Sequence, residues 1–361
     1  RFSVVGSRFK DKKLLAIKTK MLILGIETSC DETSSALIEG TSKGPKIISN
    51  IVFSQEKIHS KYFGVVPEFA SRAHLEKINW VIEKALNGKK LNQIDAVAVT
   101  VGPGLTGSLL VGKTVAQTIA YTLNKALIPV NHIEGHIFSI FLENPEIRPP
   151  FLALVVSGGH TELVIVENFG KYKLIGKTRD DAAGEAFDKV AKLLKLKYPG
   201  GPEIEKLSKI KNRYLINFPR PYMPQTFDFS FSGLKTAVVY YVRDNFSDKK
   251  MKPVDIRSIC YSFQKAVVDT LVWKTITAAK KFNLKKIVVC GGVAANMSLR
   301  EEFLQAGKKE KLDIYFPSKK LCTDNAGMIA CAGYYKIKNS KLKIKSLEVK
   351  VDPNLKLTNW L

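Results

Sequence analysis

Two short apolar runs, each followed by a polar turn and a second apolar run, open two separate parts of the chain. The first pair covers Met21–Glu27 and residues 34–39, and the second pair covers Phe151–Val156 and residues 163–167. Apolar runs of this length that are bounded by Thr, Ser, Gly and Asp are typical of β-strands. Because the strand–turn–strand opening occurs twice, the sequence predicts a duplicated domain with a cleft between its two copies.

Helical spacing and further strand signals follow these openings. Within residues 68–87, Ala70, Ala73, Ile78 and Val81 recur near one face of a helix. The other predicted elements are a strand over 95–101, a helix over 108–123, a short strand over 129–132, and a strand over Lys286–Cys290 that runs into a helix. Strands that are mixed with helices in this way predict an α/β fold.

A proline-rich stretch from Asn144 to Pro150 predicts a boundary between two lobes. The chain of 361 residues is long enough for two domains with separate cores. We expect a basic extension over 1–20, a first lobe over 21–150, a second lobe with a nucleotide pocket over 151–324, and a C-terminal segment over 325–361 that returns to the first lobe.

The formal net charge of +24 indicates an affinity for a polyanion such as RNA, DNA or an acidic membrane. The alternative is a lysine-rich surface that binds no polyanion.

The five cysteines form no CxxC pair, which indicates reduced thiols in an intracellular protein. No apolar run approaches the roughly 20 residues that a membrane span needs, so we expect no membrane association. The basic extension is interpreted as a targeting segment, an unstructured extension or an artificial addition.

The pair His132 and His136 is the most specific chemical signal in the sequence. On a helix, residues four apart share one face, so the two imidazoles lie one turn apart. Together with a distant carboxylate, Asp324, they predict a three-ligand metal site with open positions. A zinc protease needs its glutamate directly after the first histidine, whereas Glu134 comes one residue later and points elsewhere.

Glycine-rich turns predict a phosphate site. Ser157-Gly158-Gly159 lies between two predicted strands, and Gly291-Gly292 precedes a predicted helix. Backbone N–H groups in such turns and at helix N-termini bind anions. Either turn alone is a weak signal, because glycine pairs often only reverse the chain.

Two acidic segments add candidate polar contacts. Residues 179–189 have helical propensity and place Asp181, Glu185 and Asp188 on one face, and a sharp turn follows before Glu205. These carboxylates suit ribose hydroxyls, and the alternative is a solvated helix face. Asp31 and Glu32 lie in the segment that follows the first strand, where they either position a phosphate or a water molecule or only cap a turn.

The chain from Met21 to about residue 355 resembles the TsaD family of tRNA N6-adenosine threonylcarbamoyltransferases. The matching segments are GIETSCDET (25–33), GVVPEFA (64–70), GPGLTG (102–107), His132 with His136, VSGGHT (156–161), DDAAGEAFDK (180–189), YPGGP (198–202), FSFSGLKT (229–236), SFQKAV (262–267), GGVAAN (291–296) and CTDNA (322–326). So many segments in the same order make the resemblance highly specific.

The resemblance implies an actin/Hsp70/sugar-kinase-like fold with two ribonuclease-H-like lobes. It implies transfer of a threonylcarbamoyl group from threonylcarbamoyl-AMP to N6 of adenosine 37 in tRNAs that read ANN codons, with release of AMP. His132, His136 and Asp324 would hold one divalent metal, iron or zinc. The adenylate, or an AMP- or ATP-like nucleotide in the same pocket, would contact Val155, Val156, Ser157, Gly158, Gly159, Asp188, Gly201, Glu205 and Asn296. Asp31 and Glu32 would lie near the reacting centre.

The resemblance also implies partners. These are tRNA and, in the bacterial members, the helper subunits TsaB and TsaE. A homodimer is a further partner that the resemblance allows. Val155 stands where archaeal and eukaryotic members have a tyrosine, and His160 stands where they have an asparagine, so the chain is of the bacterial or organellar type. We therefore expect a cytoplasmic protein, with a mitochondrial or plastid location as the alternative if residues 1–20 are a transit segment.

Three other functions compete with transfer to tRNA. An ATP-dependent kinase or ATPase of the same fold would need Mg²⁺ and an acceptor pocket, and the paired histidines argue against it. A metalloprotease is favoured only by the histidine spacing. A non-catalytic tRNA-binding subunit would bind RNA and release no AMP.

Overall fold

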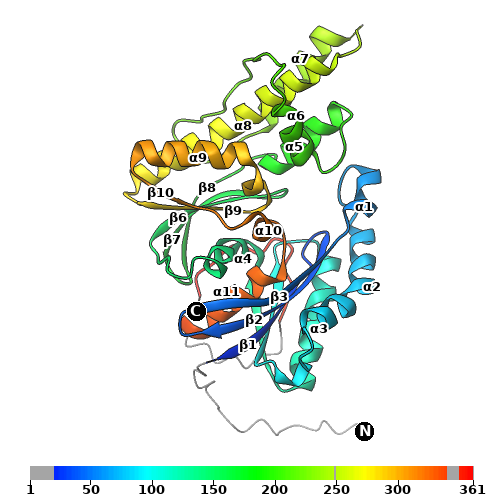
Figure 1. Cartoon of the computed structure of the whole chain (residues 1–361), viewed down its shortest axis with the longest axis vertical. Helices are drawn as coiled ribbons and strands as arrows, with labels where there is room; N and C mark the ends of the chain where they lie inside the picture. The colour runs from blue at the N-terminus through cyan, green and yellow to red at the C-terminus, as the bar shows by residue number, and fades with distance from the viewer. Residues whose placement is uncertain (1–19, 248, 340–348, 361) are drawn as a thin grey trace.

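Two sheets of the same strand order form the two halves of the described chain (Figure 1). The computed structural model describes residues 20–247, 249–339 and 349–360. The first sheet has the order β3-β2-β1-β4-β5 and comprises β1 (Met21–Glu27), β2 (Glu32–Thr41), β3 (Gly44–Ser54), β4 (Ala96–Gly102) and β5 (Ala126–Asn131). The second has the order β10-β9-β6-β7-β8 and comprises β6 (Phe151–Val156), β7 (Thr161–Asn168), β8 (Lys171–Lys177), β9 (Lys286–Cys290) and β10 (Asp313–Tyr315).

The two sheets are also paired in the same way. β1 is antiparallel to β2 and parallel to β4, and β6 is correspondingly antiparallel to β7 and parallel to β9. Each sheet then adds a parallel edge strand, β5 or β10. The duplication predicted from the two strand–turn–strand openings is therefore confirmed in the strand order and direction.

Helices cover both faces of each sheet. They are α1 (Glu56–His59), α2 (Pro67–Ala85), α3 (Thr106–Thr122), α4 (His132–Phe138), α5 (Ala183–Leu193), α6 (Gly200–Ser208), α7 (Ser232–Phe246), α8 (Pro253–Lys281), α9 (Met297–Glu310), α10 (Lys319–Cys322) and α11 (Ala326–Asn339). Short 3₁₀ helices lie at Ser60–Tyr62, Leu91–Gln93, Ser139–Leu142 and Gly292–Ala295. α2 and α3 pack on the outer face of the first sheet, and α5, α8 and α9 pack on the outer face of the second.

The alternation of side chains along β1 explains this layering. Ile23 points to the face that α4 and α11 cover, and Leu24 points to the opposite face, which α2 and α3 cover. Along β6, Ala153 and Leu154 divide in the same way between the inner and outer faces. Because both faces are buried, these strands read in the sequence as continuous apolar runs.

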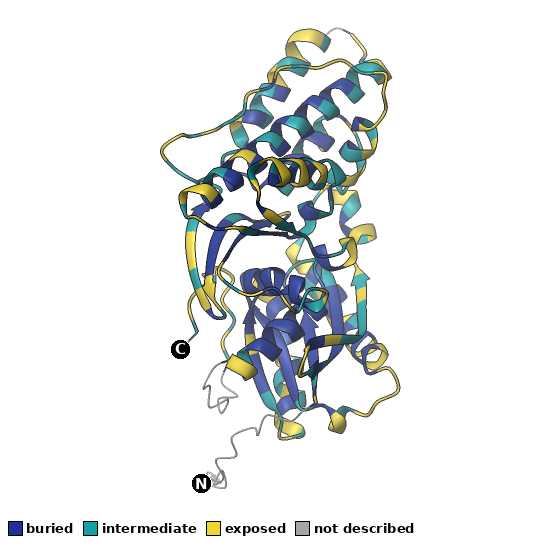
Figure 2. Ribbon diagram, turned by 60° about the vertical axis from the view of Figure 1, so that its left-hand side comes forward, coloured by how far each residue is buried: buried dark blue, intermediate teal, exposed yellow. Residues whose placement is uncertain are grey.

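α4 and α11 form a layer that both sheets share. One continuous apolar cluster joins Ile23 of the first sheet, Ile133 of α4, Ile329 of α11 and Ala153 of the second sheet. Figure 2 shows buried residues concentrated in the sheets and in the helices between them. This shared layer fixes how the two halves sit against each other.

The element bounds correct two predictions. The predicted short strand over 129–132 is in fact β5, which ends at Asn131, and His132 is the first residue of α4. The cause is a helix cap, because the side-chain oxygen of Asn131 accepts hydrogen bonds from the backbone N–H groups of Ile133 and Glu134 at 2.9 and 3.3 Å.

The second correction concerns the acidic segment near residue 180. α5 begins at Ala183, so Asp181 precedes the helix and does not share a helix face with Glu185 and Asp188. Its carboxylate instead pairs with Lys189 at 2.6 Å and with Lys235 at 3.2 Å.

Parts of the predicted N-terminal extension and C-terminal segment lie outside the described residues. The basic extension lies outside the described residues, except for Lys20. Within the C-terminal segment, residues 340–348 and 361 also lie outside them. Among the helices that are described, none is long and apolar enough to cross a membrane.

The shared layer predicts a stability effect at Gly25 of β1. A Cβ atom there would collide with the backbone of Ala326 and with Ala330, both on α11. We expect Gly25→Ala to lower the free energy of unfolding by about 1–3 kcal/mol, because a backbone neighbour cannot move cheaply. Gly233→Ala is the matched control, since a Cβ atom there meets open space. Urea unfolding of the two variants measures the difference, and equal midpoints would contradict the close packing of α11 on β1.

Candidate functional site

The predicted site residues gather at one cavity, where the carboxyl ends of β1, β6 and β9 face one another. Its volume is about 490 Å³. From the first half it is lined by Ser29, Cys30, Asp31, Glu32 and His132, among others. From the second half it is lined by Ser157, Gly158, Gly159, His160, Asp188, Gly201, Glu205, Gly292 and Asn296, among others, and Asp324 also lines it. The carboxyl ends of parallel strands are the usual ligand site of α/β sheets.

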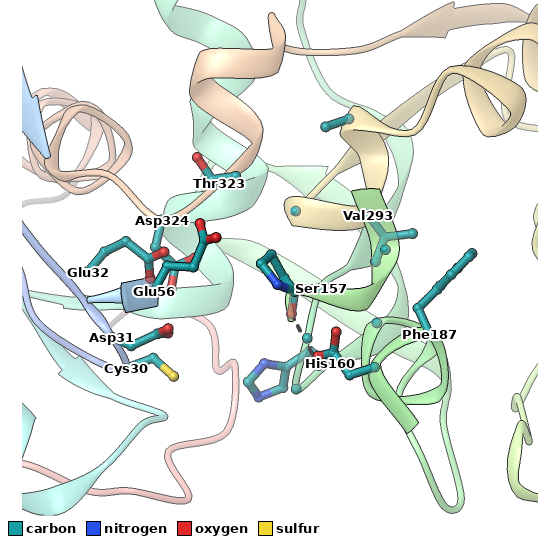
Figure 3. A pocket seen from close by; sticks show the side chains of 18 of the residues that line it. Cys30, Asp31, Glu32, Glu56, Ser157, His160, Phe187, Val293, Thr323 and Asp324 are labelled. Carbon is teal, nitrogen blue, oxygen red and sulfur yellow. Dashed lines mark hydrogen bonds between the residues drawn. The ribbon is translucent and has the colours of Figure 1, made fainter. Parts of the chain in front are cut away.

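Figure 3 shows how the two halves contribute to this cavity. Cys30, Asp31 and Glu32 lie on one side, and Ser157 and His160 lie on the other. The labelled side chains therefore come from residues more than a hundred positions apart in the sequence. A ligand in the cavity would contact both halves at once.

The three predicted metal ligands are brought together. His132 and His136 are one turn apart on α4, and Asp324 lies between α10 and α11. The Nε2 atoms of His136 and His132 are 3.1 and 3.6 Å from Asp324 Oδ1. One ligand atom from each of the three residues lies within 4.8 Å of the others.

This trio fits a divalent metal ion. Both ring nitrogens of His136 are buried; Nε2 faces Asp324 Oδ1, and Nδ1 makes no hydrogen bond within the described residues. Leaving such a group unpaired costs about 1–3 kcal/mol, so a further partner is expected there. Two imidazoles and one carboxylate are a donor set that suits Zn²⁺ or Fe²⁺ and leaves positions open.

Glu27 supports this trio from behind, and the sequence analysis did not single it out. Its Oε2 atom lies 3.2 Å from His132 Nδ1 and accepts a hydrogen bond from the Thr100 hydroxyl at 2.6 Å. Its Oε1 atom accepts from the Ser29 N–H at 2.5 Å. A carboxylate on the far nitrogen of a ligating histidine fixes the ring and leaves Nε2 free for a metal. The available signal was a charged residue at the end of an otherwise apolar strand.

Charges in the cluster favour a cation at His132. Burial alone would lower the pKa of His132, but the carboxylates of Asp324 and Glu27 outweigh it and raise the pKa to about 9. Burial alone would raise the pKa of Asp324, but His132 and His136 hold it below its ordinary value. The site therefore keeps Asp324 ionised and attracts positive charge, either a proton or a metal ion.

The glycine turns leave room for a ligand. A Cβ atom on Gly158, Gly159 or Gly292 would meet no other atom within 4 Å. The turn after β6 is held by a hydrogen bond from the Ser157 N–H to the His160 carbonyl at 2.8 Å. Side chains at these glycines would therefore project into open space along the cavity, which is the condition for close approach of a phosphate to the backbone.

Asp188 and Glu205 flank the other end of the cavity. Burial, more than any other factor, raises the pKa of Asp188 to about 6, and nearby Asp31 adds to the effect. Asp188 Oδ1 accepts a hydrogen bond from the Gly200 N–H at 2.7 Å. Glu205 Oε1 accepts from the Met297 N–H at 3.2 Å. Both carboxylates are thus held in place before any ligand binds.

Asn296 is fixed in the same way at the start of α9. Its Oδ1 atom accepts from the Leu299 N–H at 3.1 Å and caps the helix. Its Nδ2 atom donates to Gln264 Oε1 at 2.8 Å. Gln264 is almost fully buried, so the orientation of the Asn296 amide depends on a residue that lies outside the cavity lining.

The reacting end of the cavity contains Asp31, Glu32 and Cys30. Burial, and after it the nearby charge of Asp31, raise the pKa of Glu32 well above its ordinary value. Burial likewise raises the pKa of the Cys30 thiol well above its usual range. A thiol that stays protonated is a poor nucleophile, which argues against a covalent intermediate on Cys30.

Three predicted residues do not line the cavity. Val155 and Val156 are fully buried in β6, where their side chains pack in the apolar cores on either face of the sheet. The assignment of Val155 and Val156 to nucleotide binding stays a prediction, and it would have to involve their backbone atoms, because their side chains are buried. His136 is fully buried behind His132 and reaches the cavity only through the cluster.

Solved structures with the same fold are distant in sequence. A structure of full-length HypF in the phosphate- and nucleotide-bound form is 14% identical, with a TM-score of 0.60 over 92% of this chain, which spans 58% of that protein. The activator of the 2-hydroxyisocaproyl-CoA dehydratase from Clostridium difficile, with bound ADPNP, is 16% identical, with a TM-score of 0.50 over 90% of this chain and 99% of that one. The likenesses confirm the predicted actin-like fold of two α/β lobes.

Sequence comparison identifies much nearer relatives. The family model described as TsaD, tRNA N6-adenosine threonylcarbamoyltransferase, matches residues 46–331. A protein of that name from Endomicrobium trichonymphae is 50% identical over 346 residues, which cover 94% of this chain and 99% of the relative. The resemblance inferred from the sequence motifs is confirmed, and the chain belongs to the TsaD family of tRNA N6-adenosine threonylcarbamoyltransferases.

Proposed function

We propose that this protein transfers a threonylcarbamoyl group from threonylcarbamoyl-AMP to N6 of adenosine 37 in tRNAs that read ANN codons, and releases AMP. The observation that carries the proposal is the single cavity that joins the trio of His132, His136 and Asp324 to the glycine turns and carboxylates of the second half. The names of its relatives support the same reaction.

The substrate would lie across the cavity with its two ends in different halves. We assign the adenosine ribose to Asp188 and Glu205, and the phosphate to the backbone N–H groups near Gly158 and Gly159. The threonylcarbamoyl end would then point toward Asp31 and the histidine cluster. This arrangement uses the proposed lobes, residues 21–150 and 151–324, as the two walls of one site.

The reaction needs little chemistry from side chains, because the substrate is a mixed anhydride and is already activated. N6 of the adenosine attacks the carbamoyl carbon, the bond from that carbon to the phosphate oxygen breaks, and AMP leaves with the electron pair. The proton of N6 goes to a base, for which we propose Asp31. Positioning of the two reactants supplies most of the rate.

We propose that the bound metal is iron or zinc, held by His132, His136 and Asp324. When bound, such an ion supplies a Lewis acid and a template for the threonylcarbamoyl group. The residues around it do the remaining work: Glu27 orients His132, and the glycine turns receive the phosphate.

The partners and location follow as proposals from the same function. The formal net charge of +24 suits tRNA, whose binding should weaken as salt rises. We propose TsaB and TsaE as helper subunits, leave a homodimer open, and propose the cytoplasm as the location, with an organelle as the alternative.

The transfer reaction can be tested directly. We expect purified protein, with TsaB and TsaE, to label a tRNA that carries adenosine 37 from threonylcarbamoyl-AMP and to release one AMP per label. Asp31→Asn should slow labelling by about 10²–10⁴-fold, because it removes the proposed base. A matched control is Asp313→Asn, which changes an exposed carboxylate on β10 that does not line the cavity. RNA binding without labelling would favour the non-catalytic alternative, and Mg-ATP turnover without labelling would favour a kinase or ATPase.

The metal assignment predicts a loss that is measurable without any assay of activity. Asp324→Ala removes the only carboxylate of the trio, so we expect the metal content per chain to fall to near zero by elemental analysis. His59→Ala is the control, because His59 is also fully buried in the first half but contacts Gln55 instead of the trio. Equal metal content in both variants would rule out this site.

Asp188 predicts a pH dependence of nucleoside binding. Its pKa is about 6, and only the ionised carboxylate accepts hydrogen bonds from both ribose hydroxyls through free lone pairs. Lowering the pH from 7.5 to 5.0 should therefore weaken adenosine binding by about tenfold, since about a tenth of Asp188 stays ionised at pH 5. Adenosine is used instead of AMP because its phosphate cannot titrate. The affinity of Asp188→Asn should be weaker and independent of pH, and an unchanged pH profile in this variant would contradict the assignment.

A further inference from the structure

The metal-bearing helix α4 has a second face that the reaction does not use. His132 and His136 lie on one face, and Glu134 and Phe138 lie about 200° around the helix axis from them. Glu134 is the residue whose position excluded a protease, and its role was left open by the sequence. It is only 1% exposed, so its carboxylate is deeply buried.

Three donors from three separate segments surround the Glu134 carboxylate. The Tyr172 hydroxyl of β8 donates to Oε1 at 2.6 Å, and the Trp360 indole N–H donates to the same atom at 2.5 Å. Lys336 Nζ of α11 lies 2.8 Å from Oε2. A buried carboxylate is tolerated only with such partners, and each charge-assisted bond is directional. The carboxylate thus ties α4 to the second sheet, to α11 and to the C-terminal segment.

The C-terminal residues continue this connection between the two halves. The Asp352 N–H donates to the Val101 carbonyl at 2.9 Å, next to the end of β4. At the other end, the Trp360 N–H donates to the Gly170 carbonyl at 2.8 Å, in the turn between β7 and β8. The side-chain oxygen of Asn359 accepts from the Tyr172 N–H at 2.7 Å. Residues 352–360 therefore cross from the first sheet to the second.

Packing contacts hold the indole of Trp360 in one position. Its ring packs on Phe138 of α4, with centroids 6.0 Å apart, and on the Lys336 ammonium at 5.9 Å. Gly170 has φ of +74°, and a Cβ atom there would collide with the indole ring. Trp360 consequently contacts α4 twice, through Phe138 and through Glu134, one helical turn apart.

We propose that Glu134 is a positioning residue for the metal site, and that Tyr172 and Trp360 set the rotation of α4 through it. α4 has seven residues, so its own length does little to fix its orientation. A metal site needs its ligands within a few tenths of an ångström of the required geometry. Anchoring the far face of the helix fixes where His132 and His136 point. The inference rests on the proposed metal at these histidines and Asp324.

The test compares two tyrosines that each lose one hydroxyl. Tyr172→Phe removes a hydrogen-bond donor to Glu134. Tyr334→Phe removes a hydrogen bond of 2.9 Å to the Thr41 carbonyl, which does not involve Glu134. Trp360→Phe, Glu134→Gln and Glu134→Ala complete the set. The full chain is stripped with a chelator and titrated with Zn²⁺ against a competing chromophoric chelator, and the melting temperature is recorded in parallel.

We expect Tyr172→Phe and Trp360→Phe to bind Zn²⁺ about tenfold more weakly than the wild type, in the range seen for lost outer contacts of metal ligands. Tyr334→Phe should keep the wild-type affinity even where its melting temperature falls by a similar amount. Excess Zn²⁺ should restore tRNA labelling in Tyr172→Phe. Glu134→Gln keeps an acceptor for the tyrosine and the indole, so it should lose less affinity than Glu134→Ala.

Equal Zn²⁺ affinities in Tyr172→Phe and Tyr334→Phe would overturn the proposal and leave Glu134 with a purely structural role. A wild-type chain that transfers the group but binds no Zn²⁺, Fe²⁺ or Co²⁺ would overturn it as well, while the transfer function would stand. A wild-type chain that binds metal but labels no tRNA even with TsaB and TsaE present would refute the transfer function, and the comparison of affinities would still decide the role of Glu134.

Discussion

The burial of α4 and α11 between the two sheets is the constraint on which the rest of the structure depends. A helix normally buries one stripe, but α11 is buried along Ala326–Tyr335 and its small residues allow the first sheet to approach closely. Neither half can cover its inner face without this layer, since the apolar cluster is continuous from Ile23 to Ala153. The two copies of the duplicated domain are therefore held in one relative position by a shared core.

The same layer carries the reactive groups. His132 and His136 belong to α4, and Asp324 lies two residues before the start of α11, so all three are supported by packed helices. The glycine turns lie instead at the carboxyl ends of β6 and β9, and Asp188 lies within α5, which packs on the second sheet. A firmly supported trio of His132, His136 and Asp324 beside open backbone turns suits a reaction in which a threonylcarbamoyl group is held in place while its bond to AMP is replaced by a bond to an amine.

Buried carboxylates are the cost of this arrangement, and each has its own cations or donors. Glu27 lies against His132, Asp324 lies between the two histidines, and Glu134 lies against Lys336. Removing a partner from such a group leaves an uncompensated buried charge, which is strongly destabilising. Among the described residues, the lysines and arginines other than Lys274 are at least partly exposed, where water solvates them and a polyanion can contact them. Buried charges therefore need partners within the protein, whereas exposed charges are stabilised by water.

The sequence by itself determined the elements whose signals are local. The continuous apolar runs of β1, β6 and β9 were found with their bounds, because strands buried on both faces contain almost no polar residues. The spacing of His132 and His136 and the glycine turns also depend only on near neighbours. Residue type and spacing also drew attention to Asp324 and Asp188, and the family motifs then indicated Asn296, although nothing local joins these three residues.

Only the tertiary structure decided what depends on distant partners. β3 was not predicted, because its side chains are largely half exposed and carry little periodic signal. α8 was not predicted either, because its buried residues lie all around the helix. Asp181 was predicted to lie on a helix but precedes α5, where its carboxylate forms ion pairs with Lys189 and Lys235. Glu27 and Glu134 gained their roles from residues between 38 and 226 positions away. Local patterns encode local hydrogen bonds and burial, whereas a buried charge is placed by whichever donors the folded chain brings beside it.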